Sequence, residues 1–285
     1  MLHKVREIEL IASKLVETLL SGNYRSVFRG PGIEFDEVRE YVAGDDVRLI
    51  DWNVTSRMGS PYTKTFREER ELVLVLVVDV SASVFETPGQ VTKHEAESLL
   101  FAILGLAAAL NNDKVGALFF SDRTEKWVPP ARGRKHLLRL INDLVEMAPK
   151  GTGSDLQRAL RTVSEMTKRK SICVILSDFK TTGYWDELSH LAIKNDVIAV
   201  RVFDPQDDAF PVAGLVELQD PESGNTILAE GMSRSYRRQY HDFWAVHQIT
   251  WRTRCRLRGV DTLEVGTDDD CGEKLYEFFQ RRKRR

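Results

Sequence analysis

The apolar positions of the chain predict alternating buried strands and helices in its middle part. Seven consecutive apolar residues, mostly β-branched in type, occupy 72–78 after a charged segment. A short continuous run of this kind is typical of a strand that is buried on both faces of a parallel sheet. Similar runs follow at 114–120, 171–177 and 197–203, and helical patterns at 92–110, 134–147, 155–167 and 185–194 lie around and between them. This alternation predicts an α/β fold with a doubly wound, mostly parallel sheet.

The segments on either side of this core differ in character. Residues 4–20 have helical periodicity, and residues 24–70 form a charged arm in which we expect short extended pieces at 33–35, 47–51 and 62–66. Residues 125–128, closed by Pro129 and Pro130, predict an antiparallel edge strand. After residue 205 we expect a hairpin within 213–230, a long basic helix at 233–256, a strand at 261–265 and a helix at 273–280. The predicted parts are therefore an N-terminal helix and arm (1–70), a core domain (71–205) and a small α+β C-terminal extension (206–285).

Composition and charge narrow the class of protein. The 285 residues are 42% hydrophobic and 29% charged, which is ordinary for a soluble globular protein. The net charge of −2 gives no general signature of nucleic-acid binding, and the basic run at 281–285 is interpreted as a solvated tail. Three widely spaced cysteines indicate a reducing compartment. The N-terminus lacks the apolar core of a signal peptide, and the apolar span at 99–110 is too short to cross a bilayer, so we expect a cytoplasmic protein without a transmembrane segment.

The end of the 72–78 strand carries candidate chemistry. Asp79, Ser81 and Ser83 fall at alternate positions, so their side chains point the same way in extended chain. The carboxyl ends of parallel strands are where open α/β sheets bind ligands. A carboxylate with hydroxyls suits Mg²⁺ or Mn²⁺, although strand ends and helix caps also favour Asp and Ser. The pattern alone therefore leaves a metal site and an ordinary cap both open.

Two further oxygen ligands lie at other predicted strand ends. Ser154 opens the helix at 155–167, and Asp178 follows the strand at 171–177. Ser154 could instead cap its helix, and Asp178 could cap the turn to Lys180. Because the five side chains come from three loops at one edge of a parallel sheet, we predict a divalent metal site formed by Asp79, Ser81, Ser83, Ser154 and Asp178.

These segments resemble a known family. Asp79-x-Ser81-x-Ser83, Ser154-Asp-Leu-Gln-Arg-Ala-Leu160 and Ile175-Leu-Ser-Asp178 look like the three segments of a von Willebrand factor A domain, where they form the metal-ion-dependent adhesion site. The resemblance implies that Asp79, Ser81 and Ser83 hold Mg²⁺ directly or through water and that Asp178 acts through water. Ser154 stands in the family's threonine position, which keeps the hydroxyl but loses the methyl group that restricts its rotamer.

The charged arm extends the resemblance. Arg29-Gly-x-Gly32-x-Glu34-Phe35, Arg39-x-Tyr41, the segment from Gly44 to Trp52 and Glu68-Glu69 are similar to the bacterial family catalogued as domain of unknown function 58. That resemblance implies an adaptor or co-chaperone that works with a MoxR-type AAA+ ATPase or its client protein. Within the arm, the candidate partner-binding residues are Arg39, Asp46, Arg48, Asp51 and Trp52; the alternative is that the arm's charges form ion pairs on the domain surface.

An enzyme is the principal alternative class. A Mg²⁺-dependent phosphoester hydrolase of the haloacid-dehalogenase type needs a second carboxylate two residues after the strand-end Asp, but that position is Ser81. The sequence has no Gly-x-Ser-x-Gly, Walker A or His-Glu-x-x-His motif. A metal-free structural scaffold is the other alternative. We therefore expect a protein without catalytic residues, in which Mg²⁺ at the predicted site captures an acidic residue of a partner.

Overall fold

The computed structural model describes residues 2–17, 34–67, 72–85, 89–207, 210, 212–219, 226–230 and 232–284. It divides the chain into two compact units, one made of residues 1–27 and 72–285 and the other of residues 28–71. The N-terminal helix therefore groups with the core, whereas the sequence-based division placed it with the arm. Each unit is described by itself.

A six-stranded sheet forms the centre of the larger unit, in the order β10-β7-β6-β3-β4-β5. Five strands are parallel, and β5 pairs with β4 in the antiparallel direction. In register, Val77 of β3 lies between Leu118 of β4 and Ile175 of β6. The doubly wound, mostly parallel sheet and its antiparallel edge strand are thus confirmed. The bounds are β3 Val73–Asp79, β4 Lys114–Phe120, β5 Thr124–Ala131, β6 Ile172–Ser177, β7 Asp196–Phe203 and β10 Asp261–Gly266.

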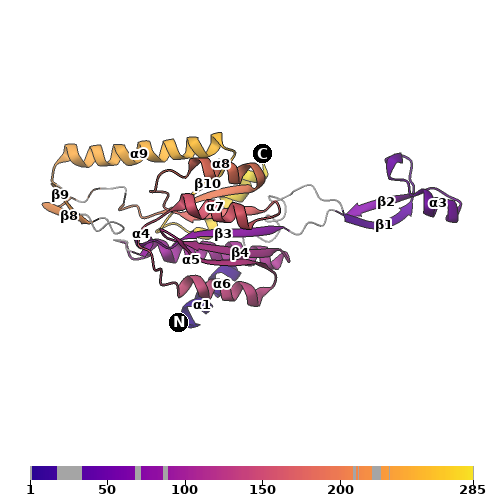
Figure 1. The fold of residues 1–285 in the computed structure, drawn as a ribbon, viewed down its shortest axis with the longest axis horizontal. Coiled ribbons are helices and arrows are strands. Elements are labelled where there is room, and N and C mark those ends of the chain that lie inside the picture. Colours follow the sequence, from indigo (N-terminus) through magenta and orange to yellow (C-terminus); the bar gives the residue numbers. More distant parts are fainter. Residues whose placement is uncertain are drawn as a thin grey trace. The chain divides into compact units, whose positions relative to one another are not determined.

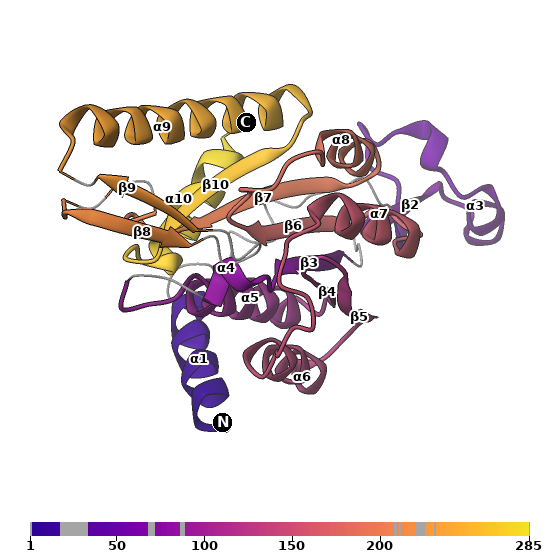
Figure 2. The same cartoon turned by 60° about the vertical axis from the view of Figure 1, so that its left-hand side comes forward.

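Helices cover both faces of this sheet (Figures 1 and 2). On one face, side chains of α7, α8 and α9 pack with β3, β4, β6 and β7 in a continuous apolar core. On the other face, α5 lies against the central strands and is covered in turn by α1, α6 and α10. The bounds are α1 Leu2–Leu15, α5 Lys93–Leu110, α6 Arg134–Val145, α7 Leu156–Met166, α8 Trp185–Lys194, α9 Arg234–Leu257 and α10 Cys271–Lys283.

The central elements are buried as their apolar runs predict. Residues 74–79 of β3 are all fully buried. Helix α5 begins with a capping box, in which Thr92 accepts from the Glu95 amide and the Glu95 carboxylate accepts from the Thr92 amide. Because α5 packs against the sheet and against α1, α6 and α10, Lys93 and Glu97 in its first turns are buried together with its apolar residues. This burial positions charge beside the carboxyl end of β3.

The C-terminal segments complete the core domain. Strand β10 pairs in parallel with β7, so the domain that was expected to end at residue 205 continues to α10. The predicted hairpin consists of β8 (Leu215–Gln219) and β9 (Thr226–Glu230), whose connecting residues lie outside the described ranges. Helix α9 buries Trp251 and Cys255 in the core and exposes most of its other residues.

The described part of the smaller unit, residues 34–67, contains a two-stranded antiparallel sheet and two short helices. Strand β1 (Glu34–Glu40) pairs with β2 (Tyr62–Arg67), which confirms the extended piece at 62–66. The extended piece expected at 47–51 is wrong. Residues Val47–Leu49 form a single 3-10 turn, η2, and α3 (Trp52–Met58) follows. The cause is local, because the carboxylates of Asp46 and Asp51 accept backbone amide protons and cap these two helices.

Several sequence-based expectations lie outside the described residues. They are the end of the first helix at 18–20, Ile33 in the first extended piece, the arm motifs at 29–33, and Glu68-Glu69.

Candidate metal centre

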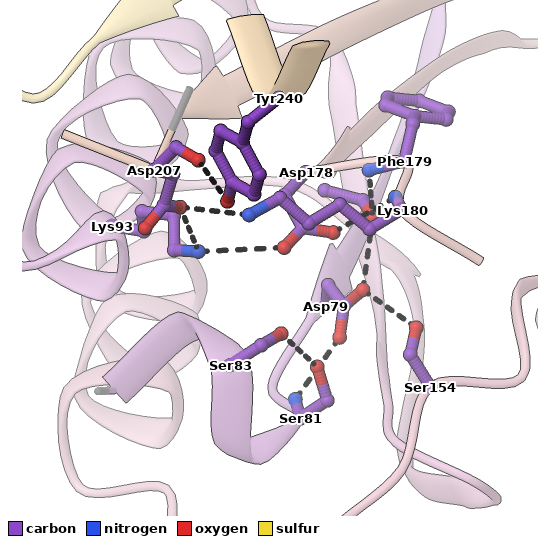
Figure 3. A network of polar contacts seen from close by, with 11 residues as sticks. Asp79, Ser81, Ser83, Lys93, Ser154, Asp178, Phe179, Lys180, Asp207 and Tyr240 are labelled. Carbon is purple, nitrogen blue, oxygen red and sulfur yellow. Dashed lines mark hydrogen bonds and ion pairs between the residues drawn. The ribbon is translucent and has the colours of Figure 1, made fainter. Parts of the chain in front are cut away.

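The strand-end carboxylate of Asp79 lies at the centre of the candidate site. Strand β3 ends at Asp79, and the chain turns at once into the short helix α4 (Ala82–Phe85). Asp79 is fully buried, and its Oδ1 accepts from the Ser81 amide at 3.0 Å. The hydroxyls of Ser81 and Ser83 lie 3.2 Å apart on the same side of the turn (Figure 3). The alternate spacing thus brings the three predicted side chains together.

Ser154 joins this group from a different loop. Its hydroxyl donates to Asp79 Oδ2 at 2.8 Å. It does not cap α7, because Asp155 is the N-cap and accepts from the Arg158 amide. The loop is fixed beside the β3 turn by a backbone bond from the Ala82 amide to the Thr152 carbonyl at 3.0 Å. The ordinary capping explanation for Ser154 therefore fails, and its hydroxyl contacts the strand-end carboxylate.

Ser177, the last residue of β6, is a site residue that the sequence reasoning missed. Its hydroxyl donates to Asp79 Oδ2 at 2.9 Å and accepts from the Phe179 amide at 3.1 Å. Phe179 has a positive φ of 54°, which is rare for a bulky residue, and its ring packs against Tyr184 and Trp251. A signal for Ser177 was present, since it directly precedes Asp178 in the quoted motif.

Asp178 occupies a different electrostatic position from the serines. Its Oδ1 accepts from the Lys180 amide at 3.1 Å, which confirms the turn-capping role considered for it. Its Oδ2 lies 3.4 Å from the Lys93 ammonium. Lys93 also contacts Asp207 Oδ2 at 2.9 Å, and Lys180 contacts the same oxygen at 3.0 Å. Asp178 is therefore paired with the Lys93 ammonium in a network that also includes Asp207 and Lys180 and that the sequence did not predict (Figure 3).

Burial changes the acidity of the carboxyl groups in this region. Burial, reinforced by the charge of Asp178, raises the pKa of Asp79 from 3.8 to about 6, although hydrogen bonds from Ser81 and Ser154 oppose the rise. Glu97 of α5 is fully buried, and burial followed by the charges of Asp79 and Asp178 raises its pKa well above its ordinary value. Within the described part of the chain, neither carboxyl oxygen of Glu97 has a hydrogen-bond partner. The site is thus an acidic centre in which burial makes an ionised carboxylate energetically unfavourable.

The donor set has the composition expected for a hard divalent cation. The Asp79 carboxylate and the hydroxyls of Ser81, Ser83 and Ser154 are all oxygen donors, the type that Mg²⁺ and Mn²⁺ prefer. Ser83 and Ser154 are only partly buried, so this cluster is accessible from solvent. Among the described residues, no group of three or more His, Cys, Asp or Glu side chains could hold a metal. Hydroxyl oxygens, rather than additional carboxylates, would have to supply the coordination.

The predicted arm residues do not share one role in the structure. Arg39 forms an ion pair with Asp45 at 2.7 Å. Asp46 and Asp51 cap the two short helices, and Asp51 also pairs with Lys64 at 3.3 Å. Arg48 and Trp52 are largely exposed, with 89% of the Arg48 side chain and 70% of Trp52 accessible to solvent. The arm thus combines structural caps with exposed side chains suitable for contact.

Comparison with known proteins identifies the family of this chain. The family model described as "Protein of unknown function DUF58" matches residues 37–250. The chain belongs to this family. The uncharacterized proteins Mb1516 of Mycobacterium bovis and Rv1480 of Mycobacterium tuberculosis are each 30% identical to this DUF58 protein over 283 residues, or 98% of this chain and 89% of theirs.

Solved structures with a similar fold are more distant in sequence. BatB from Bacteroides thetaiotaomicron is 16% identical with a TM-score of 0.48, over 75% of this chain and 100% of that one. The VWA domain of SpRpn10 is 8% identical with a TM-score of 0.42, over 72% of this chain and 94% of that one. Within its described ranges, the DUF58 protein has no helix that combines the length and apolarity needed to cross a bilayer.

Proposed function

We propose that this DUF58 protein is a non-enzymatic interaction module that captures an acidic residue of a partner protein through Mg²⁺ or Mn²⁺. The family and fold suggest an interaction module. The finer proposal is supported above all by the contact between Ser154 and Asp79. That contact brings the Ser154 hydroxyl from a separate loop to the strand-end carboxylate of Asp79. Ser154 is not needed there as a helix cap, because Asp155 caps α7.

The chain's own residues would prepare the capture. Asp79, Ser81, Ser83 and Ser154 would hold the cation, and Asp178 would act through water. Bound there, the cation supplies a hard positive centre with exchangeable coordination positions. Ser177, at the end of β6, donates a hydrogen bond to the Asp79 carboxylate, and the buried aromatic cluster around Phe179 fixes the turn that carries Asp178. The four direct donors include one carboxylate only, which leaves positive charge for an incoming Glu or Asp.

The partner we propose is a MoxR-type AAA+ ATPase, or its client protein, as the family resemblance implies. The exposed arm residues Arg48 and Trp52 provide a second surface for such a partner. Because these arm residues and the candidate metal centre belong to different compact units, variants can test arm contacts and metal contacts one at a time.

The first test is metal binding by titration calorimetry with MgCl₂ and MnCl₂. We expect one site in the wild-type protein, and loss of binding in Asp79→Ala and Ser81→Ala. Ser189→Ala is a matched control, because the Ser189 hydroxyl bonds to the Trp185 carbonyl within α8. Folded wild-type protein that binds neither ion would contradict the proposal and favour a metal-free scaffold.

The second test is binding of a purified MoxR-type ATPase in Mg²⁺ and in EDTA. We expect metal-dependent binding that Asp79→Ala abolishes, and metal-independent weakening in Trp52→Ala. Equal affinity in Mg²⁺ and EDTA would rule out capture through the metal. Metal-dependent hydrolysis of a generic phosphoester that Ser81→Ala abolishes would instead support an enzyme.

A further inference from the structure

Lys93 is a buried cation in a position where its charge is unfavourable unless it is paired. Only 2% of its side chain is exposed, and it is the first residue of α5. A lysine at a helix N-terminus lies against the positive end of the helix dipole, and an ammonium group taken from water requires compensating anions. Two carboxylates supply them, Asp178 at 3.4 Å and Asp207 at 2.9 Å.

Asp207 does not depend on Lys93 alone. Lys180, whose side chain is 28% exposed, contacts the same Asp207 oxygen at 3.0 Å. The Asp207 carbonyl also accepts from the Tyr240 hydroxyl of α9 at 2.8 Å. The segment that carries Asp207 therefore has other anchors. At Asp178, in contrast, the described contacts are the Lys93 ammonium on one oxygen and the Lys180 amide on the other.

The two carboxylates of the candidate metal centre thus differ in their partners. Asp79 is surrounded by neutral serine hydroxyls, which can turn their own lone pairs toward a cation. Asp178 is paired with a fixed ammonium, which would repel a divalent ion and competes with it for the same oxygen. This asymmetry accounts for different roles of two acids that lie at the ends of adjacent strands.

We propose that Lys93 is an internal counter-ion that keeps Asp178 out of direct metal coordination and thereby limits the affinity of the site for the metal alone. This inference rests on the proposed metal-binding function. It identifies Lys93 as a positioning residue that reserves a coordination position for a partner's carboxylate. A site closed by two protein carboxylates would hold the ion more tightly and would offer less charge to the partner.

The test is titration calorimetry with MgCl₂ alone on the full chain. Removing the positive charge in Lys93→Met is expected to tighten Mg²⁺ binding about tenfold or more. In this background Asp178 becomes a direct ligand, so adding Asp178→Asn should cancel the gain. In the wild-type background, Asp178→Asn should weaken binding by about threefold or less, as expected for a contact through water. Lys93→Arg keeps the charge and should show no gain.

Two control variants separate the expected gain in Mg²⁺ affinity from a general destabilisation of the fold. Asp207→Asn removes the other carboxylate of the network while Lys93 remains on Asp178, and it should not tighten metal binding. If Lys93→Met alone fails to fold, Lys93→Met with Asp207→Asn removes one of the two carboxylates that lose the Lys93 ammonium and should give the same gain.

The outcomes are distinguishable from failure of the proposed function. Wild-type protein that binds no Mg²⁺, together with a Lys93→Met variant that also binds none, overturns both. If the wild-type protein binds Mg²⁺ and folded Lys93→Met binds it with equal or lower affinity, the proposed role of Lys93 is overturned and the metal site remains supported.

Discussion

Replacing Asp79 by Asn should stabilise the protein in the absence of metal and should abolish the proposed metal binding. The pKa of Asp79 is raised from 3.8 to about 6, mainly by burial and then by the charge of Asp178. Because the folded state holds this proton more tightly than the unfolded chain, the ionised carboxylate destabilises the fold. The penalty is absent below pH 4, grows between pH 4 and 6, and is fully present above pH 6. A rise of this size corresponds to about 3 kcal/mol at neutral pH.

The hydrogen bonds to Asp79 make the expected stabilisation by Asp79→Asn smaller than about 3 kcal/mol, the value that corresponds to about two pKa units. Asp79 accepts from the Ser81 amide and from the hydroxyls of Ser154 and Ser177. An Asn at this position keeps one acceptor for the amide, and its NH₂ group can donate to both hydroxyls, which reorient to accept. Bonds to a carboxylate are stronger than bonds to an amide, so we expect a net gain of about 1–2 kcal/mol at pH 7.5.

The assay is urea unfolding in EDTA at several pH values between 4 and 8. The stability difference between Asp79→Asn and wild type should be largest above pH 6 and should disappear near pH 4. Asp155→Asn is a matched control, because Asn caps a helix as well as Asp does and should change stability by less than about 0.5 kcal/mol. An Asp79→Asn protein that is less stable than wild type at pH 7.5 would refute the reasoning, since it would mean that the buried carboxylate is not destabilising. Confirmation would show that the ionised Asp79 carboxylate is kept at a cost in stability.

Three further outcomes follow from the same structure. Glu97→Gln removes a buried acid whose raised pKa makes its ionisation costly, so it should stabilise the protein as pH rises above the unfolded-state pKa, with no gain in acid; the same urea series measures it. Phe179→Ala leaves a cavity against Tyr184 and Trp251 and should lower the free energy of unfolding by about 3–5 kcal/mol in urea, whereas a loss below 1 kcal/mol would show that the ring does not hold this turn. If the free metal concentration equals the Kd of the site, removing the metal with EDTA should lower the free energy of unfolding by only about 0.4 kcal/mol. Extensive unfolding seen by circular dichroism would instead indicate a structural metal.

The sequence by itself determined the sheet and most of the predicted metal site. A short apolar run such as 72–78 has few alternatives to a buried strand, and alternating helices force such strands into parallel order. Parallel strands end at one edge, so Asp79, Ser81, Ser83 and Asp178 were predictable neighbours from the sequence, whereas Ser154 lies in the loop between α6 and α7 and was grouped with them by its motif. Asp46 and Asp51 are also local capping signals, and they stabilise the short helices η2 and α3 in place of the extended chain expected at 47–51.

Only the tertiary structure decided how charge is distributed around the site. The contacts of Lys93 with Asp178 and Asp207 join positions 85 and 114 residues apart, and no periodicity relates them. The apolar pattern of α5 predicted its burial, but not which anions would meet the charged residues of its first turns. Likewise, β10 was recognisable as a strand, whereas its place beside β7 depends on a crossover through α9. Local pattern specifies what an element is and which face it buries, while pairing between distant buried charges arises only when packing brings the elements together.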